Sequence, residues 1–509
     1  MKRKNCLFAV WALALALTLA ACSGLNSNNG GGGGGGGSAT VSFVMVSDTP
    51  TTTPSVISFR VRIDTITLTS STGTQTTFSL NGGAGIVVDL MRIQSDSAFL
   101  GALAQVPTGT NSSITVSFAS PVITLFNNSG ASITNVNPAC PNLAICEITV
   151  AATGSPVITS SQPISGNAGF GIDVNLSNII NLTNGSLTLS FDNPGTTNAL
   201  SSFTLPRTGS NRLAGQFDII EDITGVVTIN GNNVTITPAT NTGRSAITAA
   251  TTAIMILDKD PSGALCNNPT PGNIASCVSN NQAASMDAIL NSDGTLVIRE
   301  IEPLLGTLQD TVEGTVVAVS SPTQFGMVIE DLIPAAANSL ISSLRIGDRL
   351  TVNLANVNPF LADTKGLPIA SSAPGILMNF VGATDTTPLR PGQVVAVHVT
   401  TFNSTVSPGA ANVDTVTLRW SRFFATPVAP FNSTSFNLTG FPPFMGSSTA
   451  LADAFPGTPT TQNVTNFDGI VDASGLDPSK LVAVRTLFIE NSTNTASPAF
   501  FAGKVRQQH

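Results

Sequence analysis

Cysteine and histidine supply much of the nucleophilic and metal-binding chemistry of proteins, and both are scarce in this chain. Six cysteines and two histidines occur among 509 residues. One of the cysteines, Cys22, comes directly after Leu19, Ala20 and Ala21, and an apolar run precedes them. Small residues at the end of an apolar run are what a signal peptidase accommodates. The pattern therefore predicts a cleavage point at Cys22.

The first 22 residues resemble a bacterial lipoprotein signal. The resemblance implies that Cys22 receives a diacylglycerol, so that the lipid anchor makes the membrane a partner. Ser23 follows Cys22, and the absence of Asp there implies, by the same resemblance, an outer-membrane location in the cell envelope. An uncleaved membrane anchor and a plain secretory signal are the alternatives. The apolar run of about 15 residues is shorter than the ~20 that a membrane-spanning helix needs.

The next segment, residues 23–38, is rich in Gly, Ser and Asn and holds eight consecutive glycines, Gly30 to Gly37. Such a stretch has too little apolar surface to offset its ordering entropy. We expect a flexible tether with a root-mean-square span of roughly 20–25 Å.

The composition favours strands and argues against polyanionic partners. Only 10% of the residues are charged, and Ser, Thr and Asn, which compete with helical hydrogen bonding, supply the polarity. The net charge is −8, or −11 for the 18 Lys and Arg against 29 Asp and Glu that follow residue 21. This balance argues against nucleic acid as a partner and against electrostatic binding to anionic lipid.

Strand patterns run through the chain and predict an all-β protein of tandem β-sandwich and small β-barrel domains. Residues 59–68 alternate in places between apolar and polar side chains, which is typical of a half-buried strand. Residues 95–103 are interpreted as a short helix. The expected domains are a lipoprotein signal (1–22), a linker (23–38), a β-sandwich domain (39–216), two small β-domains (217–305 and 306–422) and a C-terminal β-domain that is a candidate third related unit (423–509).

Two sequence elements recur after residue 217. A glycine with an acidic residue close before it opens a strand at Gly225, Gly314 and Gly469. The segment 344–352 returns as 389–397, and each copy contains a glycine-bearing turn that leads into a strand. Duplication of a small β-unit explains both elements, and the chance recurrence of strand-glycine-strand text is the alternative.

Two stretches resemble uncharacterised families of secreted bacterial domains. Residues 40–200 resemble a β-sandwich family found in lipoproteins, and residues 217–422 are similar to a family of small repeated β-barrel-like domains. Neither family carries an established catalytic or ligand residue, so the resemblance implies fold and location only. The text that carries the first resemblance is Val46-Ser47-Asp48-Thr49-Pro50, Ile63-Asp64-Thr65-Ile66, Val88-Asp89-Leu90-Met91 and Val106-Pro107-Thr108-Gly109-Thr110.

The remaining mature cysteines form two close pairs. Export implies an oxidising compartment, where close cysteines pair as disulfides. Zinc would need Cys-x2-Cys spacing with nearby histidine, and only His398 and His509 occur. We therefore expect no cofactor, and two local disulfides, Cys140–Cys146 and Cys266–Cys277.

Candidate catalytic groups have structural interpretations beside the functional ones. His398 lies in a predicted strand, and the sequence contains no Gly-x-Ser-x-Gly nucleophile elbow. A hydrogen-bonded or outward-facing histidine is therefore favoured over a general base. Asp258 and Asp260 match the beginning of an EF-hand calcium-binding loop. Pro269 stands where that loop has a bidentate glutamate, so a simple turn is favoured. The acids that could act in pairs are interpreted as solvated groups at strand ends, and they are Asp218, Glu221, Asp222, Glu330 and Asp331.

Aromatic residues offer the remaining candidates for ligand binding. Trp420, Phe423 and Phe424 are either a sugar-stacking platform or core residues, and core packing is favoured. The apolar segment 441–445 is either a domain contact or an exposed patch. We expect no catalytic residues and a non-catalytic binding or interaction module for a glycan or an envelope protein. A structural envelope component is the alternative, followed by a hydrolase with an inter-domain acidic or metal site.

Overall fold

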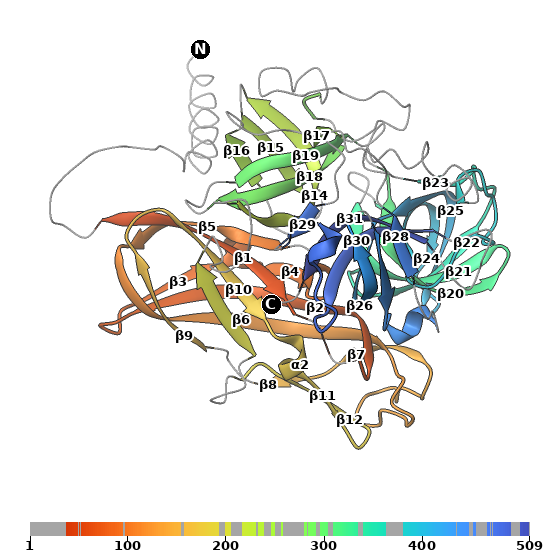
Figure 1. The fold of residues 1–509 in the computed structure, drawn as a ribbon, viewed down its shortest axis with the longest axis horizontal. Coiled ribbons are helices and arrows are strands. Elements are labelled where there is room, and N and C mark those ends of the chain that lie inside the picture. Colours follow the sequence, from red (N-terminus) through yellow and green to blue (C-terminus); the bar gives the residue numbers. More distant parts are fainter. Residues whose placement is uncertain are drawn as a thin grey trace, which may run out of the picture.

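A computed structural model shows an all-β protein (Figure 1). Its single α-helix among the described residues is the one-turn α2 (Leu176–Ile179). Short 3₁₀ helices η1, η2, η4 and η5 span Leu80–Gly83, Arg92–Gln94, Pro443–Met445 and Ala473–Gly475. The structure describes residues 37–48, 50, 52–94, 97–153, 157–192, 199–204, 216–230, 233–238, 246–249, 256–257, 279–281, 283–291, 296–303, 309–333, 339–362, 380–433, 435–446, 451–454, 466–468, 470, 472–489 and 499–507.

The N-terminal body contains three sheets. A four-stranded sheet has the order β13-β10-β1-β5, with strands Leu200–Thr204, Ala168–Val174, Ser38–Ser47 and Ala98–Pro107. A six-stranded sheet has the order β3-β2-β6-β7 with β4 on β2 and β9 on β6. Those strands are Gln75–Ser79, Ser55–Ser70, Gly109–Phe126, Ile145–Thr149, Ile86–Asp89 and Val157–Ile164. A small sheet, β11-β12-β8, holds Ile180–Thr183, Ser186–Ser190 and Ala152–Thr153.

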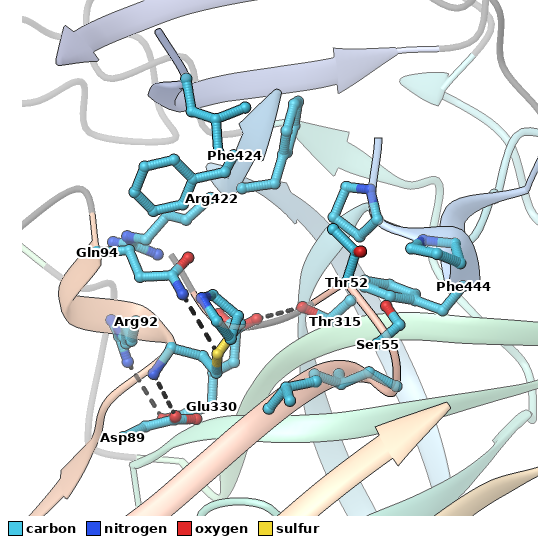
Figure 2. Close-up of a pocket in the computed structure, with 18 of the residues that line it drawn as sticks. Thr52, Ser55, Asp89, Arg92, Gln94, Thr315, Glu330, Arg422, Phe424 and Phe444 are labelled. Carbon is cyan, nitrogen blue, oxygen red and sulfur yellow. Dashed lines mark hydrogen bonds between the residues drawn. The ribbon is translucent and has the colours of Figure 1, made fainter. Parts of the chain in front are cut away.

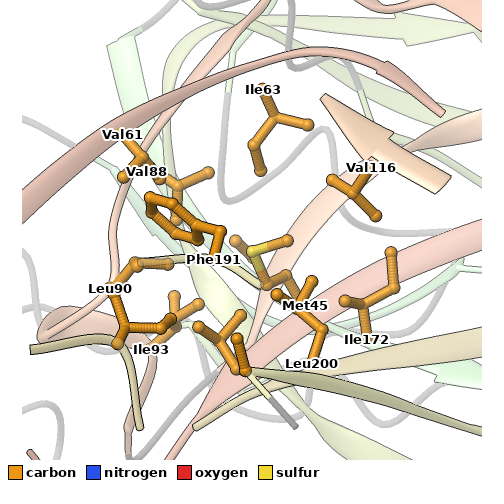
Figure 3. Packing of buried hydrophobic residues seen from close by; sticks show 14 of the residues in the cluster. Met45, Val61, Ile63, Val88, Leu90, Ile93, Val116, Ile172, Phe191 and Leu200 are labelled. Carbon is orange, nitrogen blue, oxygen red and sulfur yellow. The ribbon is translucent and has the colours of Figure 1, made fainter. Parts of the chain in front are cut away.

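The four-stranded and six-stranded sheets bury one apolar core between them, which makes this body a β-sandwich. Met45 of β1 and Ile172 of β10 belong to the same buried cluster as Val61, Val88 and Val116 of the facing sheet (Figure 3). All five side chains are fully buried. Each strand therefore contributes one apolar face to the layer between the sheets.

Three six-stranded sheets follow, and all have the same connectivity. Their strand orders are β16-β15-β14-β18-β19-β17, β22-β21-β20-β24-β25-β23 and β28-β27-β26-β30-β31-β29. The first runs through Gln216–Asn230, Asn233–Pro238, Ala246–Ala249, Ile256–Leu257, Ala283–Asn291 and Leu296–Pro303. The second runs through Thr311–Ser321, Gln324–Ile333, Arg349–Leu354, Leu361–Ala362, Val394–Asn403 and Gly409–Arg419. The third runs through Ser421–Asn432, Ser435–Thr439, Leu451–Ala454, Asn466–Asp468, Val482–Ile489 and Ala499–Gln507.

In each unit an additional parallel pairing between the third and the last strand closes five strands into a barrel. The short fourth strand pairs only with the last strand. Without it, the cyclic order is 1-2-3-5-4, which is the connectivity of the five-stranded OB barrel. We call the units first, second and third barrel in chain order. Figure 1 shows the first barrel beside β5 of the sandwich, and the other two barrels grouped together.

The expected helix at residues 95–103 is wrong. The chain makes the 3₁₀ turn η2 and then enters β5, which pairs antiparallel with β1. Residues 97–100 are all buried, so the start of the strand shows no alternation between buried and exposed side chains. A short apolar run of this kind has the same appearance in a buried strand and in a helix, and only the pairing with β1 distinguishes the two.

Candidate functional site

An open cleft of ≈ 820 Å³ lies between the sandwich and the second barrel. One wall is the end of the sandwich that carries β7, and the other consists of the turn before β22 and the loop between β24 and β25. The volume is in the range of ligand-binding clefts. The residues that line it are Pro138, Ala139, Pro141, Ala144, Ile145, Cys146, Glu147, Ser343, Leu344, Asp348, Arg349, Phe402, Ser404, Val406, Ser407, Pro408 and Gly409.

The sandwich wall is a loop closed by a disulfide. Cys140 and Cys146 are bonded with their Cα atoms 5.9 Å apart, as the sequence predicts. The fully buried Asn127 organises the loop: its Nδ2 donates to the carbonyls of Cys140 at 3.0 Å and Pro141 at 3.1 Å. At the tip, Leu143 is 68% exposed with a left-handed φ of 62°, a conformation unusual for a bulky residue. The loop is therefore a rigid element beside the cleft.

The barrel wall is fixed by the turn Arg345–Asp348, which docks against the sandwich. Gly347 has φ +87°, and a Cβ there would lie 3.0 Å from Ser58 Oγ. Thr124 Oγ1 donates a 2.6 Å hydrogen bond to the Gly347 carbonyl, and Arg60 Nη1 lies 3.5 Å from Asp348 Oδ1. Glycine thus serves both the turn geometry and the close approach of the two bodies.

Two carboxylates line the cleft, Glu147 from the sandwich and Asp348 from the second barrel. Desolvation, and then the charge of Asp348, raise the pKa of Glu147 above its ordinary value. Desolvation also raises the pKa of Asp348, while a hydrogen bond from the backbone of Arg345 and the charge of Arg60 oppose it. Arg60 and Arg349 oppose the increase in pKa at Glu147, so the two acids of the cleft lie beside arginines that compensate their charge.

A second, smaller cavity of ≈ 100 Å³ lies where the sandwich meets the second and third barrels (Figure 2). We call it the junction cavity. Its polar groups include Asp89 and Gln94 from the sandwich, Thr315 and Glu330 from the second barrel, and Arg422 from the third. The volume admits a few water molecules and no sugar or nucleotide. Its apolar lining is Val56, Ile57, Met91, Phe423, Phe424, Pro442, Pro443, Phe444 and Leu481.

A buried charge network joins the sandwich to the second barrel beside this cavity. The Arg92 side chain, only 4% exposed, places Nη2 3.7 Å from Glu313 Oε1 and Nη1 3.5 Å from Asp331 Oδ2. Arg92 Nη1 also donates to the Glu330 carbonyl at 3.3 Å. Arg419 Nε donates to the other oxygen of Glu313 at 3.0 Å. Each buried charge therefore has an opposite charge nearby.

Glu330 is the most perturbed acid of the junction. Desolvation raises its pKa from 4.5 to about 7, although Arg422, Arg92 and a hydrogen bond from Thr315 act in the opposite direction. Its Oε2 is buried and accepts no hydrogen bond from any residue that the structure describes. The expectation that Glu330 and Asp331 are solvated acids at a strand end is wrong for Glu330, which lies inside β21 with its carboxyl group enclosed by three bodies.

A second docking turn joins the second barrel to the third. In the turn 390–393, Gly392 has φ +95°, and a Cβ there would lie 2.5 Å from Met445 Cε. Gln393 Nε2 donates to the Phe488 carbonyl at 2.9 Å, and Leu487 packs in the core of the second barrel. The apolar segment 441–445 is therefore a domain contact.

The aromatic candidates divide between core and cavity. Trp420 is 3% exposed and Phe423 is 5% exposed, and both belong to apolar cores. Phe424, the next residue on β26, is half-buried and lines the junction cavity, which Phe423 also lines. An exposed stacking platform of all three residues is thus excluded, and core packing, the favoured interpretation, is confirmed for Trp420 and Phe423.

The other candidates are accounted for as follows. His398 Nδ1 lies 2.7 Å from Asp414 Oδ1 of the neighbouring strand, so this histidine has a cross-strand partner. No group of three or more His, Cys, Asp or Glu side chains that could hold a metal ion occurs in the described part of the chain. Asp218, Glu221 and Asp222 lie on β14, without described side chains. Cys22, Asp258, Asp260, Cys266, Cys277 and His509 lie outside the described residues.

Comparison with known proteins found no matching family model, curated protein or solved structure. Among the described residues there is no helix of the length and apolarity needed to cross a membrane. Sequence reasoning did not single out Arg92 or Asn127. Their partners are distant in the chain or are backbone carbonyls, and neither kind of partner leaves a local pattern.

Proposed function

We propose that this protein is a lipid-anchored component of the cell envelope that acts as a non-catalytic binding module for a glycan or an envelope protein. The observation that carries the binding role is the open cleft of ≈ 820 Å³ between the sandwich and the second barrel. It is walled by a disulfide-closed loop and a docking turn, both fixed by hydrogen bonds. A preformed cleft reduces the ordering entropy that binding would otherwise cost.

The anchoring part of the proposal rests on the N-terminal sequence. Cys22 ends a segment that resembles a lipoprotein signal, and the glycine tract that follows reaches to Gly37. The first strand of the sandwich, β1, begins at Ser38, directly after that tract. A flexible tether of this kind would let a rigid body present its cleft at varying orientations to the membrane.

The absence of catalysis is inferred from how the ionisable groups are used. Glu313 and Asp331 hold Arg92, and His398 holds Asp414. Groups engaged in this way support domain packing and strand pairing rather than proton transfer to a substrate.

A hydrolase is the second candidate, and Glu330 is the observation that favours it, because a carboxyl with a pKa of about 7 is suited to general acid chemistry. The junction cavity of ≈ 100 Å³ is the argument against it. Chromogenic glycoside and ester substrates, assayed from pH 5 to 8, test this candidate. Hydrolysis that Glu330→Gln removes would establish it.

Anchoring is tested by palmitate labelling and membrane fractionation of the wild type and Cys22→Ala. We expect label and membrane association for the wild type only, and globomycin should cause the precursor to accumulate. Binding is tested with a glycan array and with pull-down from envelope extracts, using the mature chain. If neither recovers a ligand, and deletion weakens the envelope without loss of adhesion or uptake, the structural alternative replaces the binding proposal.

A further inference from the structure

One wall of the cleft contains the edge of a sheet. Among the strands that the structure describes, β7 pairs with β6 alone. Asn127 N–H donates to the Ala144 carbonyl at 2.9 Å, which makes these residues a hydrogen-bonded pair at the end of this antiparallel ladder. Such pairs recur at every second residue. The even-numbered residues of β7 therefore direct their N–H and C=O groups to β6, and the odd-numbered residues direct theirs away from the sheet.

The outward-directed backbone groups are those of Ile145, Glu147 and Thr149. In the described part of the chain, these N–H and C=O groups have no hydrogen-bond partner outside the β6–β7 ladder. Ile145 and Glu147 line the cleft, and Glu147 and Thr149 are exposed. An edge of this kind presents donors and acceptors at the spacing of an extended polypeptide, so a further strand can add to it.

The second barrel faces this edge with an apolar surface. The Glu147 carboxylate accepts a hydrogen bond from the backbone of Arg349, so the odd-numbered side chains of β7 face that barrel. A strand added to β7 would present every second side chain to the same side. There the half-buried Phe402 and the 46% exposed Val406 line the cleft. The edge strand β3 of the same sheet has no such surface, because none of its residues lines the cleft or the junction cavity.

The loop before β7 adds an exposed apolar side chain to this surface. Leu143 is 68% exposed, and its N–H donates to the Asn127 carbonyl at 2.6 Å, which holds the residue in its left-handed conformation. Strained residues that their surroundings hold in place cluster at ligand-binding sites. Leu143 lies next to Ala144, which lines the cleft, so the loop and β7 form one continuous surface.

We infer that β7 and the disulfide-closed loop bind an extended polypeptide segment of an envelope protein, which adds as a strand to the outer edge of β7 and directs alternate apolar side chains at Phe402 and Val406. The inference rests on the proposed function and selects its protein partner over its glycan. Backbone hydrogen bonds would supply the affinity, and the apolar wall would supply the side-chain preference. A sugar has no row of donors and acceptors at strand spacing, so it would leave the edge incompletely paired.

The probe is a phage-displayed library of nonapeptides in which Thr alternates with Val, Ile, Leu, Phe or Trp. Peptides selected on the immobilised mature chain are synthesised and titrated by calorimetry. The informative variant is Glu147→Pro, which removes an outward N–H and places a ring at the edge without removing a hydrogen bond to β6. The matched control is Glu147→Ala, which loses the same carboxylate but keeps the N–H. Thermal unfolding of both variants shows whether the fold is retained.

A change in the peptide makes the same test on the unaltered protein. Only every second amide of an added strand faces β7, and the amides between them face away. N-methylation of one alternate set should therefore abolish binding, and N-methylation of the other set should preserve it. This measurement decides the question even if Glu147→Pro does not fold.

We expect a selected peptide to bind the wild type and Glu147→Ala alike, and Glu147→Pro about tenfold more weakly or worse. Binding that survives Glu147→Pro, or that tolerates both methylation patterns, would overturn strand addition. A dimer of the mature chain that Glu147→Pro dissociates would make a second copy the occupant and overturn the inferred partner. If the library gives no binder while the glycan array identifies a saccharide, this inference fails and the proposed function does not.

Discussion

The buried arginine of the sandwich allows a test of whether burial or distance determines the contribution of an ion pair. Arg92 has a 4% exposed side chain and lies 3.5–3.7 Å from two carboxylates across a domain boundary. Arg62 lies much closer to its partner Asp64, at 2.6 Å, but its side chain is 42% exposed. If distance dominated, Arg62 would contribute more. If desolvation dominates, Arg92 does, because removing it leaves buried acid uncompensated.

The expected magnitude follows from what remains after Arg92→Ala. Breaking a buried pair costs about 3–5 kcal/mol, and the lower end applies here, because Glu313 keeps Arg419 and because the Asp331 side chain is 22% exposed. Arg62→Ala should cost about 0–1 kcal/mol, which is typical of surface pairs. The two variants carry the same substitution on the same sandwich, so their difference compares a buried arginine between two bodies with an exposed one within a single strand.

The assay is urea unfolding followed by tryptophan fluorescence and by hydrogen exchange of β20 and β21. Trp420 is the single tryptophan after residue 21 and is buried beside the boundary of the second and third barrels, so its emission reports on the part of the body that Arg92 holds. We expect a clearly lower midpoint and faster exchange for Arg92→Ala, and nearly wild-type values for Arg62→Ala. Equal effects of the two substitutions would refute the reasoning.

Three further predictions follow from the same structure. The pKa of Glu330 is raised to about 7, so its protonated form stabilises the fold below pH 4.5, and that stability, on the order of 3 kcal/mol, is lost as the pH rises through 7. Unfolding measured from pH 4.5 to 8 should show this decline in the wild type, and a decline of equal size in Glu330→Gln would contradict it. Gly314→Ala should destabilise the fold by roughly 3 kcal/mol or more, because a Cβ at this position would lie 2.2 Å from a backbone oxygen of β21. Gly326→Ala on the paired strand is the control: its Cβ would make only ordinary contacts, so thermal unfolding should be nearly unchanged. Replacing Cys140 and Cys146 by serine should cost about 2 kcal/mol in urea unfolding and weaken ligand binding at the cleft, and an unchanged midpoint would exclude the loop constraint.

The fold was largely predictable because strand periodicity is a local property. Val61 and Ile63 of β2 are buried at a period of two, and so are Ile66 and Leu68, but the two pairs are out of phase with each other. A register shift between Ile63 and Thr65 in the pairing with β6 explains the interruption. The sequence shows only that the alternation is broken, and the structure shows that a bulge keeps both pairs in the core.

The sites were less predictable, because they are made of residues that become neighbours only through domain packing. Arg92 meets acids more than 200 positions away, so nothing near it in the sequence distinguishes it from a surface arginine. Asn127 binds backbone carbonyls, which every sequence contains. The disulfide between Cys140 and Cys146 is the opposite case, because its partners are close in the chain and the chemistry of the compartment leaves them few alternatives.

The repeated segments 344–352 and 389–397 each have a part that is predictable from local sequence and a part that depends on domain packing. In each, the first residue of a four-residue turn donates its N–H to the side chain of the fourth: Arg345 to Asp348 at 2.8 Å, and Arg390 to Gln393 at 2.7 Å. The third residue of both turns is a glycine with positive φ. The sequence therefore predicts the turn twice, since its hydrogen bonds are internal. The sequence that the two segments share does not predict which body each turn contacts, because one turn docks against the sandwich and the other against the third barrel. The second barrel thus uses the same type of turn twice, once against each neighbouring body, and the turn at 345–348 is the one that fixes the barrel wall of the cleft against the sandwich.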